Sequence, residues 1–562
     1  MAGETGESRL PRWAVPAAIV LAVAAIAALS FVERWRVLTS SPFPLGVDGY
    51  FYPVQLRALL ESGHLQYPAS PLAFWLLAPF AAATDPITGT KLGAAVYGAL
   101  IAVPAYGVGA QLGRSRGAGL VASAIATWSA GSLYLTVEFV KNAIGITVAL
   151  GALWLILRAL AVPRRGRIVA ACGGIVAALL AHKLAAALVI GVAIVGAIVE
   201  AIERGVLRGR RLIYLLGGLA VLAIGLLALG HLAPKRFLSL DDLRLVETLL
   251  SDEPRWSLPV LDTPATHVTL RHEPLLAALA AAVATVALIA ERRTWRGRLR
   301  TIGKILVVLG ALAIIVGVIV PLAIAGGVVV VAGGMFVLAR AKRMPVPRLS
   351  ATTQVTTRGA TVVPWLVILL AVVIAVPWLA VDDPQGLAMR LRVIAFVPLA
   401  LCTAIALRLV RSLLADDAAL CAVLAVVVVA TGARGRPEGV IPPHPALVSA
   451  VLAIDGRVQP GELVVVPERH LAFMVAWYAR VPVSLRPVDD ARWRLLPLAR
   501  TRDTALAPAL LAVRDRAELP PVIGLHPWDP NGLVLVPEVT WRYLLDHLPP
   551  SERARWLAWP TI

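Results

Sequence analysis

The stretch WAVPAAIVLAVAAIAALSFV, Trp13 to Val32, carries no charged residue and is preceded by Arg9 and Arg12. A run of about 20 apolar residues is what an α-helix needs to cross the hydrocarbon core of a bilayer. A basic start followed by an apolar run also opens a secretory signal peptide, but several more long apolar runs follow along this chain. We therefore interpret Trp13 to Val32 as a retained first transmembrane helix.

The composition of the whole chain is that of a polytopic membrane protein. Of its 562 residues, 59% are hydrophobic, and the mean hydropathy is +0.79, whereas soluble proteins contain about 45 to 50% apolar residues. The net charge of +19 comes from short basic clusters between apolar runs, which is typical of cytoplasmic loops and not of a nucleic-acid-binding surface. The three cysteines lie inside apolar segments, so neither a disulfide nor a zinc site is predicted.

Basic clusters at every second loop predict the orientation of the helices. Apolar runs of roughly 17 to 25 residues give about 13 transmembrane helices, with the N-terminus in the cytoplasm and the C-terminus outside. We expect a transmembrane domain over residues 1–431 in the cytoplasmic (inner) membrane, with large outer loops at 33–90 and 233–273. Predicted spans include 91–112, 117–136, 168–181, 184–202, 275–290, 362–381, 389–407 and 415–430, and a short interfacial helix is predicted at 71–83.

Residues 432–562 have a different character, because prolines become frequent and apolar runs shrink to the length of a strand. The segment LVVVPERHLAFMVAWYARVPVSL, Leu463 to Leu485, predicts strand, turn, helix and strand, and LVLVPEVTWRYLLDHL, Leu533 to Leu548, repeats the order of strand and helix. We expect a small soluble α/β domain outside the membrane. No glycine-rich phosphate loop, nucleophile elbow or metal motif is found in this segment.

The predicted topology gathers ionisable residues near the outer membrane surface. Each of them alone is explained better as the end of a helix whose charged group reaches for water, but their convergence on one face weakens that explanation. Asp48 has the alternative of capping a helix that begins near Tyr50 and ends at Gly63, and His182 has the alternative of a packing residue. The gathered residues are Asp48, Glu138, Lys141, His182, Lys183, Arg390 and Arg392.

These residue types suit the transfer of a group from a lipid phosphate to a hydroxyl. A carboxylate must take the proton of the acceptor, and cations must hold the charge that develops on the leaving phosphate. Asp48 suits the first role, with Glu138 as the second candidate acid. Arg390 and Arg392 suit the second role, because a guanidinium binds phosphate in a fork geometry, and Lys141, His182 and Lys183 are placed to assist. Tyr50 and Tyr52 suit a site where a lipid enters or a sugar ring stacks, with a membrane aromatic belt as the alternative.

The chain also resembles the GT-C class of membrane glycosyltransferases. The resemblance lies in GVDGYFYPVQLRALLESG after the first span, in VEFVKNAIG, AHKLAA and MRLRVIAFVPLAL, and in the C-terminal segment. It implies inverting transfer of a sugar from a polyprenyl-phosphate or polyprenyl-diphosphate donor to a glycan, lipid or protein acceptor at the extracytoplasmic face. The sequence departs from the commoner bacterial pattern, since Asp48 is followed by Gly49 where that pattern has glutamate.

Two other functions fit a multi-pass chain. A transporter or flippase for a lipid-linked or polar substrate would show two similar halves and polar groups at mid-membrane, but no such repeat is found and ionisable residues are nearly absent from the centres of the spans. A scaffold that anchors the C-terminal segment leaves the large first loop unexplained. A divalent metal remains an open cofactor, because Asp382 and Asp383 either hold one or form a solvated turn before Pro384.

Overall fold

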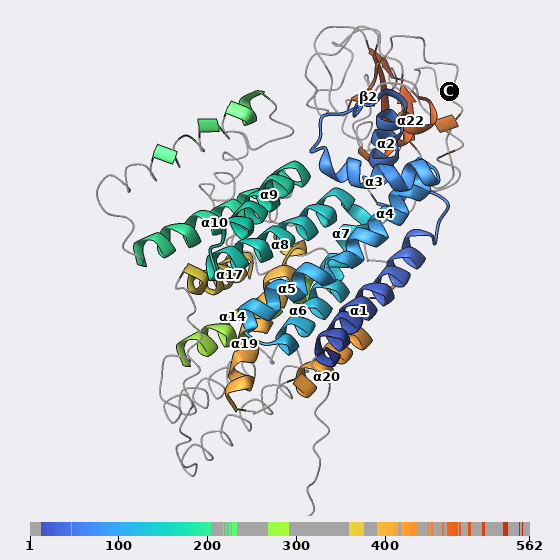
Figure 1. Cartoon of the computed structure of the whole chain (residues 1–562). Helices are drawn as coiled ribbons and strands as arrows, with labels where there is room; N and C mark the ends of the chain where they lie inside the picture. Colours follow the sequence, from blue (N-terminus) through green and yellow to red (C-terminus); the bar gives the residue numbers. More distant parts are fainter. Residues whose placement is uncertain are drawn as a thin grey trace, which may run out of the picture. The chain divides into compact units, whose positions relative to one another are not determined.

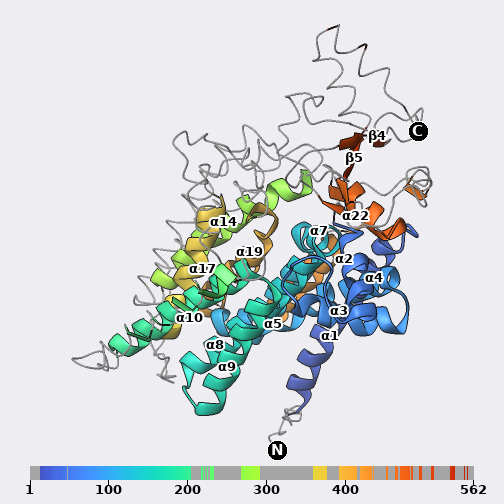
Figure 2. The same ribbon diagram turned by 90° about the horizontal axis from the view of Figure 1, so that it is seen from above.

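The computed structural model describes residues 13–46, 48–203, 268–290, 359–375, 391–413 and 418–432, and shorter pieces elsewhere that include 463–465, 469–480, 483–484, 493–495, 508–511 and 532–537. The chain divides into two compact units. The first contains residues 1–32, 97–133 and 144–434, and the second contains 33–96, 134–143 and 435–562. Figures 1 and 2 show the elements from two directions.

Most predicted apolar runs that fall on described residues are helices. They are α1 (Ala14–Leu38), α4 (Pro86–Leu100), α5 (Ala102–Gly113), α6 (Arg116–Trp128), α7 (Ala130–Glu138), α8 (Val140–Ala161), α9 (Arg165–Ala181), α10 (Lys183–Glu203), α14 (Val268–Ala290), α17 (Gly359–Ala375), α19 (Phe396–Leu413) and α20 (Ala418–Thr431). By length and composition, 5 helices of the described part are able to cross a membrane, or 6 if a bent pair is one span. The chain is therefore a multi-pass membrane protein; the prediction of about 13 spans also involves segments outside the described residues.

One predicted span is sharply bent. The run 117–136 forms α6 and α7, which meet at an angle of 46°. Ser129 lies at the break in an extended conformation, and its Oγ accepts a hydrogen bond of 3.2 Å from the backbone N–H of Ser132. A serine that caps the next helix in this way ends the preceding one, because its side chain satisfies an amide that has no partner within the new helix.

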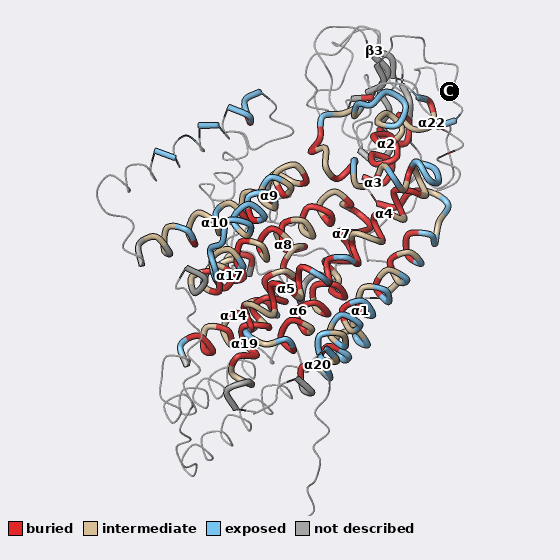
Figure 3. The backbone as a smooth tube through the Cα atoms, viewed as in Figure 1, coloured by how far each residue is buried: buried red, intermediate tan, exposed pale blue. Residues whose placement is uncertain are grey.

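The core of the first unit is built around α6, which packs against α5, α19 and α20. Figure 3 shows α6 almost entirely buried, while most of α9 is exposed or half-buried. Small residues allow close approach: a Cβ on Gly109 of α5 would lie only 2.4 Å from the Cβ of Ala122 in α6, as is usual where membrane helices pack. A buried cluster joins α1, α5, α6 and α20 through Val23, Ile26, Ala102, Ala124, Trp128 and Ala425.

The second unit contains two short helices, α2 (Phe51–Ser62) and α3 (Leu72–Ala83). Both were predicted from the sequence, and α2 ends as expected at Gly63, whose φ of 73° favours glycine. The predicted outer loop at 33–90 needs a correction at its start, because α1 continues to Leu38. The last turns of α1 are held by tertiary contacts, such as that of Arg34 with Thr136, which the length of an apolar run does not reveal.

The C-terminal part of the second unit contains a mixed sheet. Its strands are β1 (Leu463–Val465), β2 (Val483–Ser484), β3 (Trp493–Leu495), β4 (Pro508–Leu511) and β5 (Gly532–Pro537), in the order β2-β1-β5-β3, with β4 also paired to β5. β1 is parallel to β2 and β5, and α22 (Arg469–Tyr478) connects β1 to β2. The strand, helix and strand predicted within 463–485 are therefore present. That residues 432–562 fold as an independent soluble domain stays a prediction.

Candidate functional site

The loop that carries Asp48 lies against Glu138. Both acids are buried, with exposed fractions of 6% and 3%. The approach is made through Gly46, where a Cβ would lie 2.5 Å from Oε2 of Glu138 and 2.9 Å from the carbonyl oxygen of Val137. Gly46 also has a φ of 85°, a conformation that side chains with a Cβ rarely adopt. The structure thus brings the two predicted acids into one compact unit. Glycine is required at position 46 for two reasons, the lack of space for a Cβ and the positive φ.

Asp48 lies two positions before the N-cap of α2. The residue at the N-cap is Tyr50, which has helical backbone angles and makes no capping hydrogen bond with its side chain. Asp48 instead lies in a turn, where its carbonyl oxygen accepts a 3.0 Å hydrogen bond from the amide of Phe51, and the carbonyl of Gly46 accepts one of 3.0 Å from Gly49. The N-cap position is therefore assigned to Tyr50, and the role of the Asp48 carboxylate stays a prediction.

The Asp48 loop is anchored on both sides of the carboxylate. On the preceding side, Nζ of Lys91 donates to the carbonyl oxygens of Ser41 at 2.6 Å and Pro42 at 3.2 Å. On the following side, the hydroxyl of Tyr52 accepts a 3.1 Å hydrogen bond from the backbone N–H of Lys141. A carboxylate held between such anchors has a defined position, which is what proton transfer at a fixed geometry requires.

Tyr50 and Tyr52 are buried, with exposed fractions of 0% and 2%. The hydroxyl of Tyr50 lies 3.0 Å from that of Tyr478, and burial together with this contact raises the pKa of Tyr50 well above its usual range. Tyr52 satisfies an amide in the first turn of α8. Burial inside the protein does not fit the aromatic belt alternative, whose rings face lipid. Contact of these tyrosines with a substrate stays a prediction.

The sequence did not single out two buried cations of the second unit. Lys91, described above, is 7% exposed, and Arg34 is 2% exposed. Nε of Arg34 donates to Oγ1 of Thr136 at 3.1 Å, two positions before Glu138. The sequence indicates that Arg34 belongs to the first helix, because the apolar residues Trp35, Val37 and Leu38 follow it. Nothing in the sequence indicates its contact with Thr136, which lies 102 positions away.

His182 and Lys183 belong to the first unit, at the junction of α9 and α10. His182 has an extended backbone, and its Nδ1 accepts a 3.4 Å hydrogen bond from the amide of Ala185. A Cβ on Gly145 of α8 would lie 2.4 Å from the Cβ of His182, so this junction packs closely on α8. His182 thus packs against α8, and Lys183 begins the first turn of α10. The predicted part of both residues in binding a substrate stays a prediction.

Arg392 is 1% exposed and lies just before α19. Its carbonyl oxygen accepts a 3.0 Å hydrogen bond from Ala395. Arg390, Asp382 and Asp383 lie outside the described residues, so their predicted roles are not placed. Within the described ranges, no group of three or more histidine, cysteine or acidic residues gathers as metal ligands.

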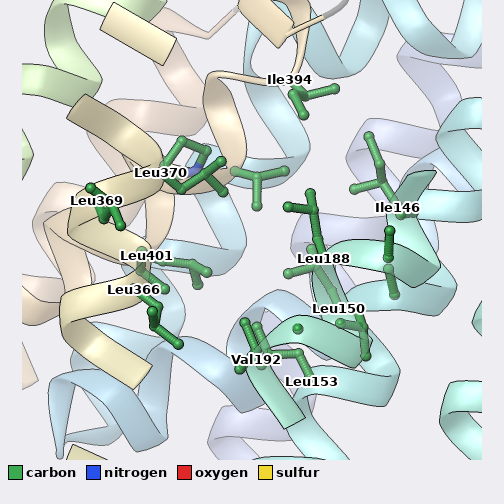
Figure 4. Close-up of a pocket in the computed structure, with 18 of the residues that line it drawn as sticks. Ile146, Leu150, Leu153, Leu188, Val192, Leu366, Leu369, Leu370, Ile394 and Leu401 are labelled. Atoms are coloured by element: carbon green, nitrogen blue, oxygen red, sulfur yellow. The ribbon is translucent and has the colours of Figure 1, made fainter. Parts of the chain in front are cut away.

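An apolar pocket of about 450 Å³ lies between α8, α10, α17 and α19 in the first unit. Every side chain that lines it is apolar. Figure 4 shows Ile394 and Ile146 toward one end and Leu153, Val192 and Leu366 toward the other, with Leu188 between them. The lining residue Ile394 follows Arg392 by two positions, and Ala185 donates its amide to His182. The pocket therefore combines an apolar wall with segments that carry two of the predicted cationic groups.

No family model matches the sequence of this chain, and no curated protein matches it. Among solved structures, two of ArnT from Cupriavidus metallidurans are similar to it, one in the apo state and one bound to undecaprenyl phosphate. Both are 16% identical, with TM-scores of 0.34 and 0.36, and each match covers 85% of this chain and 87% of the other. At this level the likeness assigns no function to this chain.

Proposed function

We propose that the chain is an integral membrane glycosyltransferase that moves a sugar from a polyprenyl-phosphate or polyprenyl-diphosphate donor to an acceptor hydroxyl, with Asp48 as the general base. The observation that carries the proposal is the apolar pocket of about 450 Å³ beside α10 and α19. Its volume is in the usual range for a bound small molecule. Its wall offers no polar group, so it suits a hydrocarbon chain and does not suit a sugar or a free nucleotide.

One end of this pocket suits an anionic head group. The first turns of α10 and α19 contribute Ala185 and Val397 to the lining, and Ile394 precedes α19. The N-terminal ends of helices attract anions, because their first amides have no partner within the helix. Arg392, His182 and Lys183 lie within three positions of these lining residues. A lipid phosphate bound here is neutralised as the bond to the sugar breaks.

Asp48 supplies the other half of the chemistry. The acceptor oxygen attacks the anomeric carbon while the carboxylate takes its proton, and the bond from that carbon to the phosphate oxygen breaks, which inverts the configuration. The carboxylate is buried and its loop is anchored by Lys91 and Tyr52, which supports this role. Glu138 is the second candidate acid. In this proposal the reaction takes place at the extracytoplasmic face, and the acceptor is a glycan, a lipid or a protein.

The test is sugar transfer from a radiolabelled polyprenyl-phosphate sugar by the purified chain in lipid nanodiscs. Asp48→Asn keeps the size of the side chain and removes the base, so we expect normal yield and a rate lower by a factor of about 10² to 10⁴. Glu61→Gln removes an exposed acid of α2 and is the matched control, which should keep the parent rate. An Asp48→Asn rate within about threefold of the parent would overturn the base assignment and direct attention to Glu138.

One observation favours the second candidate function, a lipid flippase. The span that breaks between α6 and α7 is a kind of interruption found in transporters. The buried charges argue the other way, because Arg34, Lys91, Arg392 and Arg408 all lie near the ends of their candidate spans. Movement of a fluorescent polyprenyl-phosphate lipid across a vesicle membrane, without any sugar transfer, would replace the enzyme proposal by the flippase.

A further inference from the structure

A second cavity of about 520 Å³ lies in the first unit, at the break between α6 and α7. Its walls come from α6, α14, α19 and α20, and most of its lining is apolar. The polar exceptions are Ser129, Glu273, Thr403 and Thr431. This cavity shares no lining residue with the apolar pocket described above, and it plays no part in the proposed transfer.

Glu273 is the ionisable group of this lining. It is 7% exposed, and its Oε2 accepts a 3.1 Å hydrogen bond from the backbone N–H of Gly131 in the first turn of α7. Glycine is needed there, because a Cβ on residue 131 would lie 2.7 Å from Oε2 of Glu273 and 2.2 Å from the carbonyl oxygen of Val393. The break in the span thus turns a helix N-terminus toward a carboxylate, which stabilises its anionic form.

The carboxylate has no protein cation to pair with in the described part of the chain, where the ion pair that the structure shows joins Arg36 to Glu33. A carboxylate in apolar surroundings is costly unless its charge is compensated. A primary ammonium group is a ligand that offers both the charge and the N–H donors. Glu273 therefore selects for a ligand whose polar end is an ammonium and whose remainder is apolar.

A basic group lies next to one of the residues that line the cavity. The guanidinium of Arg434 is 5.8 Å from the ring centroid of Trp128, and Trp128 lines the cavity. Gly432, the residue after α20, lies close to Trp128, because a Cβ on it would lie 2.7 Å from the Cβ of Trp128. Arg434 is exposed, so it is available to an anionic group of the same ligand.

We propose that this cavity binds a phospholipid with a primary ammonium head group. The ammonium pairs with Glu273, the phosphate faces Arg434, and the hydrocarbon lies along the apolar residues of α14 and α19. A quaternary ammonium cannot donate a hydrogen bond to the carboxylate, and a lipid without an amine leaves it unpaired. The site therefore distinguishes phosphatidylethanolamine from both phosphatidylcholine and phosphatidylglycerol.

Native mass spectrometry of the full chain, released from nanodiscs with equal amounts of these three lipids, tests the proposal. We expect phosphatidylethanolamine to be retained in preference to the other two. Glu273→Gln should lower this preference by roughly tenfold, because the amide oxygen still accepts a hydrogen bond but carries no charge to pair with the ammonium. Thr285→Val changes a residue of α14 that does not line the cavity and whose hydroxyl donates within its own helix, and it should keep the preference. Equal retention by the parent, or an unchanged preference in Glu273→Gln, would overturn the proposal.

A second measurement needs only the parent protein, in case Glu273→Gln does not fold. Dicyclohexylcarbodiimide reacts with carboxyl groups in apolar surroundings, and the modified peptide is identified by mass spectrometry. In nanodiscs of phosphatidylethanolamine, labelling of Glu273 should be slower than in nanodiscs of phosphatidylglycerol. Equal labelling rates in the two lipids would contradict an ammonium bound at this carboxylate.

Discussion

The hydroxyl oxygens of Tyr50 and Tyr478 lie 3.0 Å apart, although 428 positions separate the two residues in the chain. The contact is one of several between α2 and α22. The two guanidinium nitrogens of Arg57 donate to the carbonyl oxygens of Trp477 and Ala476, each at 2.8 Å. These carbonyls end α22, so Arg57 provides partners that the helix itself cannot supply. The C-terminal helix is therefore part of the framework that begins two residues after Asp48.

We expect Tyr478→Phe to weaken the packing of α22 against α2 but not to unfold the protein. The variant leaves the hydroxyl of Tyr50 buried without this partner, which should lower the free energy of unfolding by about 1 to 3 kcal/mol. Thermal denaturation followed by intrinsic fluorescence would show a lower Tm. Tyr106→Phe is the control, because no hydrogen bond of this hydroxyl is found in the described residues, and its Tm should match the parent. If both variants melt like the parent, α22 does not support the Asp48 loop.

The same contact explains why the candidate site was only partly predictable. Asp48 and Glu138 were identified from the local sequence, because an acidic residue next to an apolar run can be recognised without knowledge of the fold. Tyr478 and Thr136 were not found, since their importance depends on partners far away in the sequence. Helix positions were predicted well from apolar length, as α9 and α10 show, but the break at Ser129 was missed. An apolar run gives no warning when a single serine caps a new helix.

Gly46→Ala should disturb Glu138. Alanine at a φ of 85° is strained, at a cost of about 1 to 2 kcal/mol, and its Cβ would also lie 2.5 Å from Oε2 of Glu138. Gly63→Ala is a matched control, because Gly63 has a φ of 73° but a Cβ there meets nothing within 4 Å. Both variants should lose stability in thermal denaturation. Only Gly46→Ala should also lose sugar transfer, and equal transfer in the two would show that the contact with Glu138 is unimportant.

Asp85 should stabilise α4 in a pH-dependent way. Its Oδ1 accepts hydrogen bonds from the amides of Ile87 at 2.8 Å and Thr88 at 3.0 Å. Partial burial acts to raise the pKa of Asp85, but the hydrogen bonds from Thr88 and Ile87 outweigh it and lower the pKa below 3.8. A lowered pKa means that the stabilisation is fully present above the unfolded value and is lost as the pH falls through the folded value.

Asp85→Ala should therefore lower the free energy of unfolding by about 1 kcal/mol at neutral pH, as the loss of a helix cap does. Melting temperatures of parent and variant, measured from pH 7 downward, should stay separated until the pH falls below the ordinary pKa of 3.8 and then converge. Asp85→Asn should keep much of the stability at neutral pH, because asparagine also caps helices. A gap between parent and Asp85→Ala that widens on acidification would contradict the capping role.

Leu188→Trp should separate binding of the lipid chain from the chemistry of transfer. Leu188 lies between the two ends of the apolar pocket (Figure 4), so a tryptophan there takes space from a bound hydrocarbon. Exclusion of about three carbon atoms, at about 0.8 kcal/mol each, raises KM for a long-chain polyprenyl-phosphate sugar by a factor of about 50. A donor with a short, two-isoprene chain should be used as well as by the parent. Val176→Trp places the same residue on α9, at a position that is 55% exposed and outside the pocket, and should change neither KM. If Leu188→Trp raises KM equally for the long and the short donor, or for neither, the lipid chain of the donor does not occupy this pocket.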